Sequence, residues 1–192
     1  GDNSNTTFSG TIQDGSGTLG LTKIGSGTLL LSGSNTYSGI TTINAGTLKA
    51  GSASAFGSGA ISVTSGAVLD LNGQTISTGS LTLNGTGLSS GGALINSSST
   101  VATYAGLVTL GSDSSIMGDT GSIILSNSGT ISGSGFGLTL GGASGGSIAS
   151  IIGTGTGTLT KQDAGAWMLS GSNSYSGTTT ISAGTLKAGV LT

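Results

Sequence analysis

Few residues in this chain could perform acid–base chemistry. The sequence contains no His, Arg, Glu or Cys, and its six anions are all Asp. Two of them, Asp113 and Asp119, lie close together in the segment DSSIMGD. Glycosidases use a pair of carboxylates, one of which has a raised pKa. A Gly- and Ser-rich turn usually leaves such side chains in solvent, so the sequence predicts no catalytic residue.

Oxygen ligands for a cation are concentrated only at the start of the chain, in Asp2, Asn3, Ser4 and Asn5. An EF-hand loop needs several acids and a terminal Glu, and the nonapeptide Ca²⁺ repeat needs regularly spaced Asp. The chain has neither pattern. We therefore predict no metal site and no cofactor, and a solvated end within the polar residues 1–16.

The charge balance and the length of the apolar runs exclude two classes of partner. The four cations are Lys23, Lys49, Lys161 and Lys187, the formal net charge is −2 and the sequence pI is about 4.4. Nucleic-acid binding needs a basic stripe, which these residues do not form. No apolar run approaches the roughly 20 residues of a membrane span. We expect no nucleic-acid partner and no membrane insertion of this segment.

The four lysines occupy matched positions in a duplicated block. Residues 21–51 align with residues 159–189 without a gap at an offset of 138, and 22 of the 31 positions are identical. The chain also has 40 Gly residues, 5% charged residues and a mean hydropathy of +0.31. Disordered chains are less hydrophobic and more charged. An ordered repeat architecture is therefore favoured.

Apolar residues in each block alternate with polar ones, which is typical of strands with one buried face. Leu29, Leu48 and Leu69 recur at a nearly constant spacing, and a second series behaves in the same way. The second series consists of Ile43, Ile61 and Leu81. A unit of about 20 residues cannot bury its own apolar face, so neighbouring units must stack. The sequence predicts an all-β solenoid with coils of about 20 residues.

This pattern predicts which side chains point inward. Thr28 and Thr82 should be exposed, Leu30 and Met168 should point outward, and Trp167 should fill core volume. Asn72-Gly73 and Asn84-Gly85 fit turns at strand ends, because both residue types tolerate positive φ. The residues expected to be buried are Leu29, Leu31, Ile43, Leu48, Leu69, Leu71, Leu81 and Leu83.

The register cannot be followed between residues 87 and 157. Strand candidates there are residues 93–95, 107–110, 122–125, 138–140 and 148–152. If the offset of 138 spans whole coils, about seven coils separate the two blocks. Alternation also predicts that Thr154, Thr156, Thr158 and Thr160 share one strand face. An ice-binding protein needs such an array on every coil, and residues 17–86 do not reveal one.

The string GTLLLSGSNTYSGITTINAGTLKAG resembles the passenger-associated β-strand repeat of bacterial autotransporters. Copy one matches from Gly27 to Leu48 and copy two from Gly165 to Leu186, with Trp167-Met168 in place of Leu29-Leu30. The resemblance implies a right-handed parallel β-helix. It also implies an extracellular location on the bacterial cell surface, either anchored at the outer membrane or secreted.

We therefore expect residues 1–192 to be a single β-helix segment and a fragment of a longer repeat protein. Its expected function is that of a structural or adhesive stalk or fibre segment without catalytic activity. Its expected partners are further coils of the same chain, an identical neighbour stacked end to end, a host or neighbouring cell surface, or a glycan.

Two alternatives remain at this point, a carbohydrate-active β-helix enzyme and an ice-binding solenoid. Pectate-lyase-type enzymes use an Arg base and acidic Ca²⁺ ligands, and polygalacturonases use clustered Asp with a His. The chain lacks Arg, His and an Asp cluster, so the enzyme alternative is disfavoured.

Overall fold

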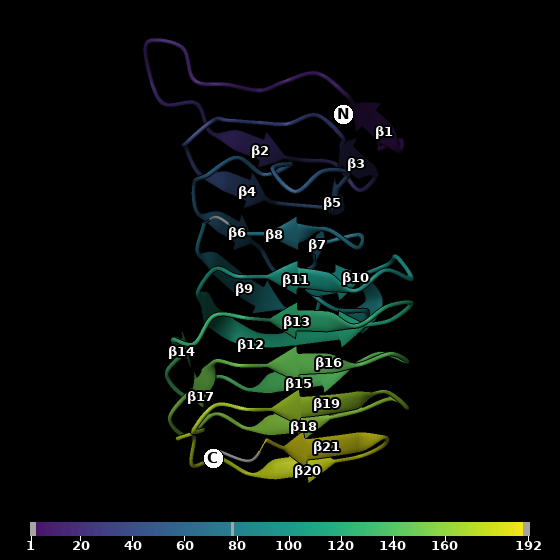
Figure 1. The fold of residues 1–192 in the computed structure, drawn as a ribbon, viewed down its shortest axis with the longest axis vertical. Coiled ribbons are helices and arrows are strands. Elements are labelled where there is room, and N and C mark those ends of the chain that lie inside the picture. The colour runs from purple at the N-terminus through teal and green to yellow at the C-terminus, as the bar shows by residue number, and fades with distance from the viewer. Residues whose placement is uncertain (1–2, 78, 190–192) are drawn as a thin grey trace.

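The computed structural model describes residues 3–77 and 79–189 as an elongated stack of coils. The strands β1 (Thr6–Phe8) and β21 (Thr185–Ala188) lie at opposite ends of the stack (Figure 1). The described residues form 21 strands in sheets of 15 and 6 strands, and one 3₁₀ turn, η1 (Leu88–Ser90). Every pair of strands described is parallel, and paired residues lie on successive coils. The predicted fold class, a parallel β-solenoid, is confirmed. Within the described residues, no helix is long and apolar enough to cross a membrane.

Three ladders of paired strands run along the stack. The first ladder consists of β2 (Leu21–Lys23), β4 (Thr41–Ile43), β6 (Ile61–Val63), β9 (Leu81–Gly85), the start of β12 (Val108–Gly118), β14 (Thr130–Ser132) and β17 (Ile151–Gly153). The second ladder consists of β1, β3 (Thr28–Leu31), β5 (Thr47–Ala50), β7 (Val68–Asp70), β10 (Leu94–Asn96), the end of β12, β15 (Leu138–Gly141), β18 (Leu159–Lys161) and β20 (Thr179–Ile181). The third ladder consists of β8 (Thr75–Ile76), β11 (Ala102–Tyr104), β13 (Ile123–Leu125), β16 (Gly146–Ile148), β19 (Ala166–Leu169) and β21.

The inward side chains form one core between the ladders. Seven of the eight residues expected to be buried are buried, but Leu29 is only partly so. Its partner on the preceding coil is the exposed Thr6, which covers less of Leu29 than a Leu would. Trp167 is fully buried and its indole N–H donates to the Gly141 carbonyl at 2.9 Å.

Two expectations about the outer face are wrong. Thr28 and Thr82 are half-buried rather than exposed. Each lies in a column of outward residues from successive coils, and the neighbours above and below cover its flanks. Met168 is exposed as predicted, whereas its counterpart Leu30 is half-buried.

Most strand candidates between residues 87 and 157 are confirmed. The four candidates at 93–95, 107–110, 122–125 and 138–140 fall on β10, β12, β13 and β15. The candidate at 148–152 is wrong as a single strand, because the chain turns there between β16 and β17. β11 and β14 have no candidate among those expected.

The assumption of whole coils between the two blocks is also wrong. Six steps of pairing along the second ladder lead from Leu29 to Lys161, whereas the equivalent of Leu29 in copy two is Trp167 on the third ladder. Coil length varies, since Leu29 pairs with Leu48 but Leu69 pairs with Leu94. The two copies are therefore separated by six full coils plus the step from one ladder to the next. Copy two begins on the second ladder, whereas copy one begins on the first.

We expect the core to dominate stability. Leu48 is fully buried, so Leu48→Ala should cost about 2–5 kcal/mol of unfolding free energy. Thr82→Ala, on the outer face, should cost less than about 1 kcal/mol. Urea denaturation followed by circular dichroism measures both. Equal losses would mean that the inward and outward assignments are incorrect.

Candidate functional site

Each repeat contains a buried lysine whose ammonium group joins two coils. Lys23 on β2 is 6% exposed, and its Nζ donates to the carbonyls of Ile24 at 2.9 Å, Gly25 at 2.6 Å and Ala45 at 3.0 Å. The first two acceptors belong to the turn after β2, and Ala45 belongs to the equivalent turn one coil later. The ammonium group therefore ties successive turns together.

Copy two repeats this arrangement at its equivalent lysine. Lys161 is fully buried, and its Nζ donates to the carbonyls of Gln162, Asp163 at 2.6 Å and Ala183 at 3.1 Å. An ammonium group has three donors, and all three are used in both copies. Burial lowers the pKa of Lys23 and of Lys161, and the nearby Asp163 opposes this effect on the pKa of Lys161. We refer to each set of three bonds as a lysine staple.

The Asn of the repeat provides a second link between coils. Asn35 Oδ1 accepts a hydrogen bond from Ile12 N at 2.8 Å, and its Nδ2 donates to the Ala55 carbonyl at 2.6 Å. Its side chain thus connects the preceding and the following coil. In copy two, Asn173 Oδ1 accepts from Ile152 N at the same distance of 2.8 Å.

A tyrosine and a threonine pair recurs as well. The Tyr37 hydroxyl lies 2.6 Å from Thr41 Oγ1, and the Tyr175 hydroxyl lies 2.7 Å from Thr179 Oγ1. Tyr37 is fully buried and Tyr175 is half-buried. Burial raises the pKa of Tyr37, whereas its bond with Thr41 acts in the opposite direction. This hydroxyl stays protonated and structural at neutral pH.

The repeat also contains its own stacking partners. Lys23 pairs with Ile43 in copy one, just as Lys161 pairs with Ile181 in copy two. The second strands of each copy stack in the same way, β3 on β5 and β19 on β21. Because these contacts are internal, the block keeps its geometry although the two copies lie on different ladders.

The structure does not bring Asp113 and Asp119 together. Asp113 is exposed on β12, where its Oδ1 accepts a hydrogen bond from Gly137 N at 2.7 Å. Asp119 follows the end of the same strand. Six residues of extended chain span roughly 20 Å, whereas glycosidase carboxylates lie about 5–10 Å apart. Partial desolvation, with the negative charges of Asp163 and Asp70, raises the pKa of Asp119.

The N-terminal oxygen ligands serve the backbone of the next coil. Asn3 Oδ1 accepts from Ser26 N at 2.9 Å and Asn5 Oδ1 accepts from Thr28 N at 2.8 Å. Asp2 lies outside the described residues. Among residues 3–77 and 79–189, no three His, Cys, Asp or Glu side chains lie close enough to hold a metal ion.

The prediction of four Thr on one strand face is wrong. Thr154 is buried, Thr156 and Thr158 are exposed, and only Thr160 lies in a strand, because the chain turns before β18. A hydroxyl column does exist elsewhere, on the outer face of the first ladder. It places one hydroxyl on each of six successive coils, from Thr22, Thr42, Ser62, Thr82, Thr109 and Ser132.

This column was detectable in the sequence, since its first four members recur at equal intervals along the chain. It is a single row: at Thr42 and Ser62, the residues on either side are buried in the core. Thr109 Oγ1 and Ser132 Oγ lie 3.2 Å apart and can hydrogen-bond to each other.

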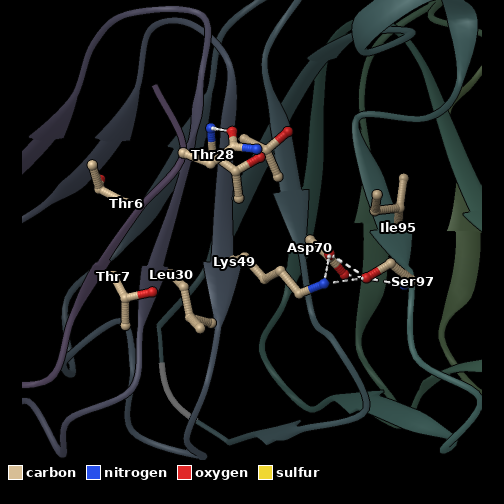
Figure 2. Close-up of a pocket in the computed structure, with 10 residues that line it drawn as sticks. Thr6, Thr7, Thr28, Leu30, Lys49, Asp70, Ile95 and Ser97 are labelled. Atoms are coloured by element: carbon tan, nitrogen blue, oxygen red, sulfur yellow. Dashed lines mark hydrogen bonds and ion pairs between the residues drawn. The ribbon is translucent and has the colours of Figure 1, made fainter. Parts of the chain in front are cut away.

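A groove of about 520 Å³ crosses the outer face of the second ladder (Figure 2). At one end, Lys49 Nζ lies 3.4 Å from Asp70 Oδ2 and 2.7 Å from Ser97 Oγ, while Ser97 Oγ donates to Asp70 Oδ2 at 2.5 Å. Sequence reasoning missed this cluster because its members come from different coils and are far apart in the chain. The groove is lined by Asn5, Thr6, Thr7, Thr28, Leu30, Thr47, Lys49, Asp70, Ile95 and Ser97.

Stacked parallel coils, an apolar core and two matched polar blocks define a solenoid built on a repeat. The family described as passenger-associated-transport-repeat matches residues 21–50 and 159–188. The resemblance identified in the sequence is therefore confirmed: the chain contains two copies of this repeat.

Most of the chain is also similar to a curated protein. It is 36% identical over 184 residues to the adhesin BmaC autotransporter of Brucella suis biovar 1 (strain 1330). The match covers 94% of this chain but only 4% of that adhesin. No solved structure matches the chain.

The lysine staple predicts that Lys161 and Lys187 of copy two contribute very differently to the local stability of the last coils. Lys161→Met should leave three carbonyls without their donor and cost at least about 2 kcal/mol locally. Exchange of the Leu159 and Ser182 amides, which bond across β18 and β20, should accelerate about 30-fold. Lys187→Met, at an exposed position on β21, should change these rates less than about threefold. Equal acceleration in both variants would show that the staple contributes nothing specific.

The raised pKa of Asp119 predicts a pH-dependent stability. Between the unfolded pKa of 3.8 and the higher folded pKa, the folded state binds more protons, so unfolding free energy falls as pH rises. Asp119→Asn should therefore raise the thermal midpoint at pH 7 and leave it unchanged well below pH 3.8. Asp113→Asn is the matched control. An equal gain for Asp119→Asn at both pH values would contradict the electrostatic origin.

Proposed function

We propose that this chain is a non-catalytic stalk segment of an exported bacterial surface protein. The observation that carries the proposal is the second ladder, in which parallel pairing continues from Thr6 to Ile181 without a missing coil. A rod of this kind transmits force through the backbone hydrogen bonds between paired strands, which run along its axis from coil to coil.

The proposed rod is short and stiff. Coils stack at about 4.8 Å, so about nine of them span roughly 45 Å. Each fully buried Leu, Ile or Val side chain contributes about 1.5–3 kcal/mol to its cohesion. A lysine staple lies near each end of the rod, where fraying would start.

The similarity to an adhesin autotransporter supports a location on the cell surface, either anchored at the outer membrane or secreted. The chain spans 4% of that relative, so a role in adhesion is proposed only as that of a spacer. The wide separation of Asp113 and Asp119 supports a function without catalysis.

We further propose that an additional coil, from the same chain or an identical neighbour, stacks on copy two. Ile181 is 54% exposed, whereas its equivalent Ile43 is fully buried. The difference arises because β6 pairs with β4, while no described strand pairs with the outer side of β20.

Deleting one repeat interval from the full-length surface protein tests the spacer proposal. Removal of residues 51–188 joins Ala50 to Gly189 and preserves one complete repeat. A spacer should tolerate this loss: surface display and cell adhesion should persist, with the rod about 30 Å shorter in electron micrographs.

A matched deletion of residues 51–184 joins Ala50 to Thr185 instead. This junction keeps residues 21–50 intact and adds four residues before Gly189. Because coil length already varies along the stack, this variant should also be displayed, and it controls for the exact position of the junction. Normal display of the first variant with complete loss of adhesion would show that these coils contact the target themselves. That result would overturn the spacer proposal.

A further inference from the structure

We infer that the groove on the second ladder is a binding site for a short neutral oligosaccharide. This site is separate from the stalk function and does not depend on it. Its floor is a column of outward residues paired in register on five successive coils, in the order Thr7, Leu30, Lys49, Asp70 and Ile95. A volume of about 520 Å³ lies within the range of small-molecule sites.

The rim of the groove has unused hydrogen-bonding capacity. The hydroxyls of Thr7, Thr28 and Thr47 have no partner within the described residues and can donate or accept. Asn5 uses its Oδ1 for Thr28 N, which leaves its two Nδ2 donors for a ligand. These groups suit a ligand with many hydroxyl oxygens.

Apolar side chains alternate with the polar ones along the floor. Leu30 and Ile95 are both half-buried, so part of each side chain faces the groove (Figure 2). The C–H faces of a pyranose ring can cover such surface while its hydroxyls reach the threonines. A purely polar ion would leave this apolar surface uncovered.

The ionic cluster favours a neutral ligand over a charged one. Asp70 is 2% exposed and accepts hydrogen bonds from Ser97 Oγ and from the backbone N–H groups of Asn72 and Ser97. The Lys49 ammonium group lies 3.4 Å from Asp70 Oδ2 and balances the charge of this carboxylate. A second N–H group of the same ammonium donates to Ser97 Oγ. One ammonium donor of Lys49 remains for a ligand oxygen, but the pair as a whole has no net charge.

Methyl-resolved NMR titrations of the intact chain test this site. The probes are cellotriose, maltotriose and triacetylchitotriose at millimolar concentration, with trigalacturonate as the charged comparison. We expect at least one neutral probe to shift the methyl signals of Thr28, Thr47, Leu30 and Ile95 in a saturable manner, and trigalacturonate to bind more weakly.

Two isosteric variants separate this groove from the rest of the surface. Thr47→Val removes a hydroxyl from the rim and should weaken binding about three- to tenfold. Thr42→Val removes a half-buried outer hydroxyl from the first ladder, outside the groove, and should leave binding unchanged. Absence of saturable shifts with all three neutral probes, or equal effects of the two variants, would overturn the assignment. Stronger binding of trigalacturonate would also overturn it.

Discussion

Every coil of this protein depends on its neighbours for stability, because a single coil can neither bury its apolar side chains nor pair the backbone groups of its strands. The same residue in the two copies of the repeat shows the size of this effect. Ile43, which lies between two coils, is fully buried, and Ile181, which lies on the last described coil, is 54% exposed. Parallel stacking therefore supplies both the hydrogen bonds and the burial. The core, the staples and the outer columns all follow from it.

Within that stack, polar groups fix where each coil lies on the next. Apolar contacts are not directional and would tolerate sliding, whereas the ammonium groups of Lys23 and Lys161 each require three carbonyls from two turns. Asn35 adds a bond to the coil on each side. Because the lysine bonds are internal to the repeat, whereas those of Asn35 reach Ile12 and Ala55 outside it, the staple keeps its geometry in copy two although that copy lies on another ladder. The same regular stacking places outward residues in columns, which form the hydroxyl row and the groove.

Alternation and spacing predicted the solenoid and most of its core, since apolar residues such as Leu48 and Leu69 recur at nearly constant intervals. The inward direction of Lys23 and Lys161 could not be predicted, because it depends on carbonyls that converge only when two turns stack. Burial of the outward Asp70 depends on Ser97, which lies on a later coil. The rotation between copies depends on coil lengths that vary along the stack, and a Gly- and Ser-rich segment does not reveal such lengths.

Disulfide cross-linking of the stacking register between β9 and β12 is therefore the most direct test of the structure. The chain has no native Cys, so engineered pairs give an unambiguous signal. Thr82 and Thr109 are in-register partners on adjacent coils, at a separation that a disulfide can bridge. Thr82→Cys combined with Thr109→Cys should form an intramolecular disulfide on mild oxidation.

A coil of the same length as the two before it, in which Thr42 pairs with Ser62 and Ser62 with Thr82, would instead place Thr82 next to Ala102. Efficient bridging of cysteines at positions 82 and 102, with none at 82 and 109, would contradict the register and the rotation of the copies.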